Sequence, residues 1–150
     1  MPIVVGPDMG DRSQRMVWID LEMTGLDITK ESIIEIATVI TDSDLNILAQ
    51  GPNLAITVSE ELLAGMDEWN TTHHNNSGLV DRIRTAGVSL SEAEEKTVEF
   101  LREWVDPNSA PLCGNSVWND RRFLDKEMPL VADYLPVSYT HLTLPTNGCV

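Results

Sequence analysis

Residues 16–26, MVWIDLEMTGL, decide the fold expected for this chain and carry its first candidate functional groups. The stretch begins with an apolar run that leads to an acid, which is typical of a buried strand reaching a polar edge. Alternate strand residues point the same way and lie about 6.6–7 Å apart along the strand, so Asp20 and Glu22 are expected to face one site. Gly25 follows, and a glycine there lets the backbone approach a ligand closely.

The two carboxylates indicate a metal site, because anions held this close repel each other and hard divalent ions such as Mg²⁺ prefer oxygen ligands. For an isolated D-x-E triplet, two solvent-facing acids at a strand end are the simpler interpretation. A third acid, Asp120, lies in GNSVWNDRRFL, residues 114–124, where a tight loop is expected to lead into a helix. That loop is able to direct Asp120 at the strand pair. An acid stabilised by the helix dipole is the alternative.

Two further strands are predicted directly after the first. Residues 32–41, SIIEIATVIT, are rich in β-branched side chains, and residues 45–58 contain a second such stretch that is interrupted at Gly51-Pro52. With the first strand they form three successive strands that we expect to be antiparallel. Residues 111–115 predict one more brief, buried strand.

Helices dominate the second half of the sequence. Short helices are predicted at 60–66 and 78–85, and the polar stretch between them, 69–76, has turn character and one large aromatic residue. A longer helix begins at Ser91, which forms a capping box with Glu94, and Pro107 ends it. A last helix covers 118–128. The order of strands and helices predicts an α/β domain with a mixed sheet and helices on its faces.

Length and charge limit the possible functions. The chain has 150 residues, and its 24 acidic against 10 basic side chains give a net charge of −14, which fits one domain and opposes long-range attraction to duplex DNA or an anionic membrane. No apolar run approaches the roughly 20 residues of a membrane helix, and the start lacks the order of a signal peptide, so a cytoplasmic protein is expected. Cys113 and Cys149 are predicted to be reduced thiols, with Cys113 buried.

Four segments in order resemble one enzyme family. They are WIDLEMTGLD at 18–27, IIEIATVITDSDLNILAQGP at 33–52, MDEWN at 66–70 and CGNSVWNDRRFLDKEMP at 113–129. They resemble the oligoribonucleases, DEDD-type 3′-to-5′ exoribonucleases with a ribonuclease H-like fold, over roughly residues 16–135. The resemblance implies that the mixed sheet and its helices follow that fold, incomplete at the C-terminus. It also implies a substrate, short single-stranded oligoribonucleotides, degraded to nucleoside 5′-monophosphates. A substrate of a few nucleotides needs few phosphate contacts, so the net charge does not oppose it.

The resemblance also assigns roles to individual residues. Asp20 and Glu22 match the first exonuclease motif and Asp120 the second, and in the family these acids bind two Mg²⁺ or Mn²⁺ ions. Two ions about 3.5–4 Å apart orient and deprotonate a water and stabilise charge on the leaving oxygen.

Four more positions match substrate contacts of the family. Leu26 matches a residue that wedges between the last two bases, and Trp69 one that stacks on a base, an interaction blind to base identity. His74 and Ser116 match positions that contact the substrate phosphate. Without the resemblance, Trp69 is expected to be a core or half-buried aromatic and His74 a surface loop histidine.

The sequence departs from the family after residue 135. The family continues to a third motif with a general-base histidine and a fourth metal-binding aspartate, whereas residues 136–150 are uncharged and His141 is followed by no aspartate. We therefore expect a flexible lead at 1–15, a partial exonuclease domain at 16–135, and a non-family tail at 136–150 that is artefactual or disordered. Such a chain is expected to be inactive or impaired. The family forms homodimers, and the missing helices would supply much of that contact.

Other functions fit the same residues. A DEDD-type exonuclease acting on DNA is the nearest, although the MTGLD and MDEWN segments favour an oligoribonuclease. A non-catalytic fragment that binds short RNA ends through Leu26, Trp69 and His74 is another. The plainest is an acidic globular domain whose carboxylates are solvated.

Overall fold

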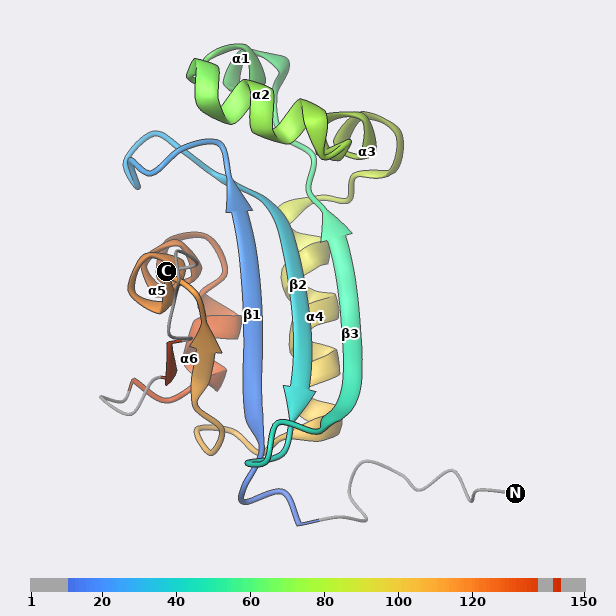
Figure 1. The fold of residues 1–150 in the computed structure, drawn as a ribbon, viewed down its shortest axis with the longest axis vertical. Helices are drawn as coiled ribbons and strands as arrows, with labels where there is room; N and C mark the ends of the chain where they lie inside the picture. The colour runs from blue at the N-terminus through green and yellow to red at the C-terminus, as the bar shows by residue number, and fades with distance from the viewer. Residues whose placement is uncertain (1–10, 138–141, 144–150) are drawn as a thin grey trace.

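A mixed five-stranded sheet forms the centre of the molecule (Figure 1). The structure is a computed structural model, and it describes residues 11–137 and 142–143. The strand order is β3-β2-β1-β4-β5, with β1 antiparallel to β2, β2 antiparallel to β3, and β4 parallel to both β1 and β5. The strands are β1 (Met16–Met23), β2 (Ile33–Thr41), β3 (Ile47–Ala55), β4 (Leu112–Gly114) and β5 (Leu142–Thr143). The predicted mixed sheet and its three antiparallel strands are confirmed.

Two strands are longer or more regular than the sequence indicates. β1 continues past Asp20 to Met23 because it stays paired with β2, so both candidate acids lie within the strand. β3 runs through Gly51-Pro52, where an interruption was predicted. Proline lacks a backbone donor, and β3 accommodates it because it lies at the edge of the sheet. A side chain at Gly51 would lie within 2.6 Å of the Phe100 ring, so the glycine allows a helix to pack closely there.

The helices form two groups around the sheet (Figure 1). A cluster at one end of the sheet contains α1 (Glu60–Ala64), α2 (Glu68–Asn76) and α3 (Leu79–Ala86). α4 (Leu90–Trp104) crosses one face behind β2 and β3, whereas α5 (Val117–Glu127) and α6 (Pro129–Tyr134) lie on the β4 side. The helix expected at 118–128 is confirmed as α5, and α6 was not predicted.

Two helix predictions need correction. The polar stretch 69–76 is not a turn but most of α2, which begins after Asp67, whose side chain accepts from the Asn70 N–H. α4 begins one residue before Ser91, because Ser89 is the N-cap and accepts a hydrogen bond from the Glu92 N–H. The capping pair at 91 and 94 was therefore placed two residues too late.

The hydrophobic core has two parts. The larger lies between the sheet and α4, α5 and α6, and its fully buried residues include Ile19, Ile36, Leu101 and Phe123. The smaller lies beneath the α1–α3 cluster around Ile34. Cys113 is buried, as predicted, whereas Cys149 and His141 fall outside the described residues. No helix in the described part of the chain is long and apolar enough to span a membrane.

Both ends of the described chain contact the domain. Arg12 donates to the carbonyls of Arg102 and Glu103, and Arg15 donates to that of Trp104, so two cations cap the last turn of α4. At the other end, Leu142–Thr143 pairs with β4. The limits expected from the sequence, 1–15, 16–135 and 136–150, stay predictions.

A buried arginine should stabilise the junction of α5 and α6. Arg121 donates to the carbonyls of Ala132 and Leu135 at 2.9–3.3 Å, satisfying the end of α6. Arg121→Met keeps much of the aliphatic stem but removes these bonds, and should lower the free energy of unfolding by about 2–3 kcal/mol in urea titrations. Arg122→Met, at an exposed neighbouring position, is the control and should change it by less than about 0.5 kcal/mol. Equal losses in the two variants would contradict this role.

Candidate active site

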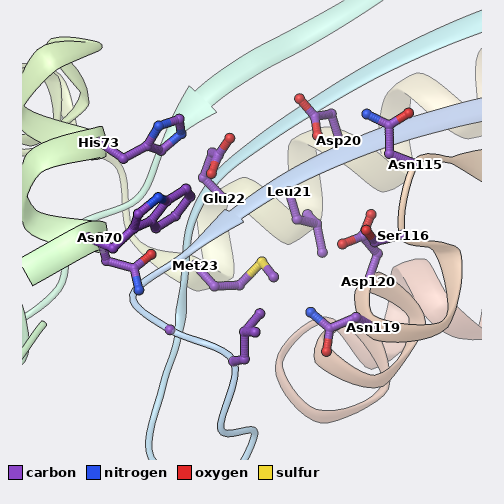
Figure 2. A pocket seen from close by; sticks show the side chains of 13 residues that line it. Asp20, Leu21, Glu22, Met23, Asn70, His73, Asn115, Ser116, Asn119 and Asp120 are labelled. Atoms are coloured by element: carbon purple, nitrogen blue, oxygen red, sulfur yellow. The ribbon is translucent and has the colours of Figure 1, made fainter. Parts of the chain in front are cut away.

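A cavity of about 480 Å³ opens over the second half of β1, between α2 and α5 (Figure 2). Its floor comes from β1, and its walls from the β1–β2 loop, α2, and the turn from β4 into α5. Six of the seven site residues expected from the sequence line it: Asp20, Glu22, Leu26, Trp69, Ser116 and Asp120. His74 does not. The remaining lining residues are Leu21, Met23, Gly25, Asn70, His73, Asn115 and Asn119.

Three carboxylates meet in the cavity because of the strand pairing. Asp20 and Glu22 alternate along β1 and therefore face the same side. The parallel pairing of β1 with β4 brings the β4–α5 turn alongside, and Asp120 lies in the first turn of α5 with 6% of its surface exposed. A side chain at Gly114 would lie 2.9 Å from the Ile19 carbonyl oxygen. Glycine is therefore required for this turn to approach β1.

Burial and neighbouring negative charges raise the pKa of all three acids. Burial, with the charges of Asp20 and Glu22, raises the pKa of Asp120 to about 7. The pKa of Glu22 is raised by burial and, to a smaller extent, by the charge of Asp20. The pKa of Asp20 is raised by burial and, to a smaller extent, by the charge of Glu35. A cluster of carboxylates that resists ionisation needs a cation to be fully charged. Its all-oxygen donor set fits a hard divalent ion such as Mg²⁺ or Mn²⁺.

Two large apolar side chains stand exposed at the cavity. Trp69 is 68% exposed on α2, and Leu26 is 74% exposed on the β1–β2 loop. Trp69 stacks on His73 of the same helix, with ring centroids 4.8 Å apart and an angle of 13° between the planes. The stack fixes the indole on the cavity wall. An aromatic face held in this way is suited to stacking on a nucleic-acid base.

The loop that carries Leu26 is attached to the helix that carries Asp120. Glu127, at the end of α5, accepts hydrogen bonds from the Ser32 hydroxyl at 2.9 Å and the Ile33 N–H at 2.8 Å. Lys126 donates to the Ile28 and Glu31 carbonyls. Sequence reasoning missed these two residues because nothing in local spacing links them to a loop almost a hundred positions earlier.

The α5 wall contains two residues that a pattern would have revealed. Asn115, Ser116, Asn119 and Asp120 recur at helical spacing, so all four line the cavity from one face. The hydroxyl of Ser116, the N-cap position, makes no capping bond to the helix. Asn115 and Asn119 were not singled out from the sequence, although this i, i+3, i+4 pattern around Asp120 was visible in it.

His74 occupies a different place from the other expected residues. It is 1% exposed within α2, not a surface loop residue, and its Nε2 lies 2.9 Å from the Met23 carbonyl oxygen. Burial lowers the pKa of His74 below its usual value. The bond ties α2 to the end of β1. Its expected contact with a substrate phosphate stays a prediction.

Comparisons with known proteins agree on one family. The RNase_T family model, described as an exonuclease, matches residues 17–144. A protein named oligoribonuclease from Pseudomonas aeruginosa is 54% identical over 133 residues, which cover 89% of this chain and 73% of that protein. The oligoribonuclease of Alcanivorax borkumensis is 54% identical over 121 residues, 81% of this chain and 67% of that protein.

Solved structures share the fold at low sequence identity. E. coli exonuclease I in complex with a 5cy-dA13 oligonucleotide superposes with a TM-score of 0.63 at 13% identity, covering 87% of this chain. A product-bound exonuclease I gives a TM-score of 0.59 at 12% identity over 74% of this chain. This chain spans about a quarter of those two proteins, at 27% and 24%. The likeness establishes the predicted ribonuclease H-like fold.

The raised pKa of Asp120 makes stability depend on pH in the absence of metal. Its folded pKa of about 7 exceeds the usual 3.8, so between these values the folded state holds a proton that the unfolded state has lost. Stability should therefore fall as pH rises from 5 to 7, with Asp120 contributing at most about 1.4 kcal/mol per pH unit. Urea unfolding in EDTA measures the slope.

Two variants isolate the contribution of Asp120. Asp120→Asn should flatten the slope, because the amide does not titrate. Asp133→Asn replaces an exposed acid on α6 and should leave the slope unchanged. An identical slope in wild type and Asp120→Asn would show that Asp120 ionises normally.

Proposed function

Because the chain belongs to the RNase_T family of exonucleases and, within it, to the oligoribonucleases, we propose that it removes nucleotides from the 3′ end of short single-stranded oligoribonucleotides. The products are nucleoside 5′-monophosphates. One observation carries the proposal: a three-carboxylate cluster and an exposed, stacked tryptophan share a single cavity. This arrangement suits a site that grips a base and cleaves the adjoining phosphodiester.

Asp20, Glu22 and Asp120 hold the divalent ions in this proposal. Divalent ions held there, Mg²⁺ or Mn²⁺, would supply activation of the attacking water and stabilisation of the charge on the leaving 3′ oxygen. The side chains' own part is to supply oxygen donors from two rigid elements, β1 and α5. Burial, followed by the charges of the neighbouring acids, raises the pKa of Glu22 and Asp120, so a bound cation would favour their ionised forms.

The remaining cavity residues position the substrate. Trp69 stacks on a base, and Leu26 wedges between the last two bases from the opposite loop. Stacking on an aromatic face is independent of base identity, which suits degradation of mixed sequences. Ser116 donates its hydroxyl to a substrate phosphate. For His74, a phosphate contact requires its ring to leave the buried position beside Met23.

Charge favours a short substrate. The net charge of −14 repels a long polyanion, whereas a dinucleotide or trinucleotide has few phosphates to accommodate. Cations held by the carboxylate cluster would offset the repulsion at the scissile phosphate. Specificity for short chains therefore follows from placing the positive charge only where hydrolysis occurs.

The cytoplasmic location and the family homodimer are part of the same proposal.

The 150-residue chain should cleave slowly. Its sequence lacks the histidine-plus-aspartate motif expected from the family, and a positioned general base contributes about 10²–10⁴-fold to rate. With Mn²⁺ and a 5′-labelled ribodinucleotide, we expect rates lower by about that factor than those of the Pseudomonas aeruginosa oligoribonuclease. Asp20→Asn should abolish the residual release of mononucleotide, whereas Asp81→Asn on α3 should not.

The same assay discriminates the alternatives. Comparable rates in the two proteins would refute the impairment. Faster cleavage of single-stranded DNA than of the ribodinucleotide would favour a DNA exonuclease. Dinucleotide binding without any product, at every metal concentration, would favour a non-catalytic RNA-end binding protein.

Trp69 should contribute to binding through stacking. Trp69→Ala should weaken the affinity for a non-hydrolysable ribodinucleotide by about 1–3 kcal/mol, which calorimetry in Ca²⁺ measures. Trp118 is the matched control, because it is 80% exposed at the start of α5 yet does not line the cavity. Trp118→Ala should leave the affinity unchanged. Equal losses of ribodinucleotide affinity in the two variants would show that the base does not stack on Trp69.

A further inference from the structure

Two consecutive histidines of α2 lie beside the carboxylate of Glu22. One possible ligand atom from each of Glu22, His73 and His74 lies within 4.8 Å of the other two. Figure 2 shows His73 directed at Glu22 across one end of the cavity, with the other acids, Asp20 and Asp120, further along. Two imidazoles and one carboxylate form a donor set different from the oxygen-only cluster of Asp20, Glu22 and Asp120.

The hydrogen bonding of His74 prepares it for metal binding. The Met23 carbonyl can only accept, so Nε2 of His74 carries the hydrogen of this bond and the lone pair of the neutral ring lies on Nδ1. Nδ1 is buried and has no hydrogen-bond partner in the part of the chain that the structure describes. A metal-binding histidine commonly donates its other ring N–H to a carbonyl, which fixes the ring and its tautomer. His74 has this arrangement.

His73 supplies an adjustable second nitrogen. Its exposed ring stacks on Trp69 and meets the His74 ring edge-on, with centroids 5.2 Å apart. Metal–nitrogen distances of about 2.0–2.1 Å place tetrahedral ligand atoms roughly 3.3 Å apart. The three ligand atoms now lie within 4.8 Å of one another, so each pair must approach by about 1.5 Å at most to bind one ion. The exposed His73 ring and the half-buried Glu22 side chain would supply that movement, because the buried His74 ring is held at the Met23 carbonyl.

We propose that Glu22, His73 and His74 form a second cation site that binds a transition-metal ion such as Zn²⁺. Imidazole nitrogens favour such ions, whereas Mg²⁺ requires oxygen ligands, so the two sites differ in selectivity. Two histidines and one carboxylate leave a coordination position for water. The helix α2 and the strand β1 would be joined by the bound ion.

The shared residue makes this site inhibitory. Glu22 belongs to both donor sets, so Zn²⁺ held by the histidines withdraws it from Asp20 and Asp120. The ion also holds His73, the stacking partner of Trp69, away from its present position. Zn²⁺ should therefore oppose Mn²⁺-supported cleavage. This consequence rests on the proposed nuclease function, whereas the binding of Zn²⁺ does not.

Binding is tested with the full chain, freed of metal, by titrating Zn²⁺ alone against a chromophoric chelator. His73→Gln should weaken Zn²⁺ binding at least about ten-fold, whereas Asp120→Asn and the exposed α2 control Thr72→Gln should change it by less than about two-fold. Mg²⁺ should show the reverse pattern, with Asp120→Asn the weaker binder. Electron paramagnetic resonance of the Cu²⁺-loaded protein should show nitrogen coupling that weakens in His73→Gln.

The outcomes separate this inference from the proposed function. Unchanged Zn²⁺ affinity in His73→Gln, or an equal loss in Asp120→Asn, would overturn the second site whatever the nuclease assay gives. If Mn²⁺ supports cleavage, inhibition of His73→Gln should need at least about ten times more Zn²⁺ than inhibition of wild type. If no variant cleaves RNA but the Zn²⁺ pattern holds, the site stands and the proposed function fails.

Discussion

The close approach of the β4–α5 turn to β1 is the constraint on which the site depends. Only two residue pairs join β1 to β4, and the Gly114 backbone lies so near the Ile19 carbonyl that a methyl group would clash at 2.9 Å. This contact delivers Asp120 from a position a hundred residues distant to the strand that carries Asp20. Without it, the chain would have two acids on a strand and a third on an unrelated helix.

Holding like charges together has an electrostatic cost that the fold partly offsets. Glu35 is the cross-strand partner of Glu22 on β2, and its charge, after burial, raises the pKa of Asp20. Arg82 of α3 forms an ion pair with Glu35. One arginine therefore reduces the negative potential at the site and attaches the α1–α3 cluster to the sheet. The remaining repulsion depends on how β1 and α5 place the three acids, and under the proposed function bound cations would neutralise it.

The sequence was sufficient for the sheet and for most of the cavity. Apolar β-branched runs predicted the three antiparallel strands, and the resemblance selected six residues that do line one cavity. The failures have local physical causes. Residues 69–76 are polar with almost no amphipathic pattern, so only the Asp67 cap and the burial of His74 reveal a helix. Pro52 suggested a break because the sequence did not show that β3 is an edge strand.

The contacts that no sequence pattern could reveal are those that assemble the site from distant segments. Glu127 fixes the loop of Leu26 through Ser32 and Ile33, and His74 fixes α2 through the Met23 carbonyl. All three bonds end on residues 23–33, which comprise the end of β1, the loop after it and the first residue of β2. Leu26, Trp69 and the β1 carboxylates are therefore all anchored to a single piece of backbone. A displacement of that segment would move the β1 carboxylates and the exposed apolar side chains together, so the two parts of the cavity are mechanically coupled.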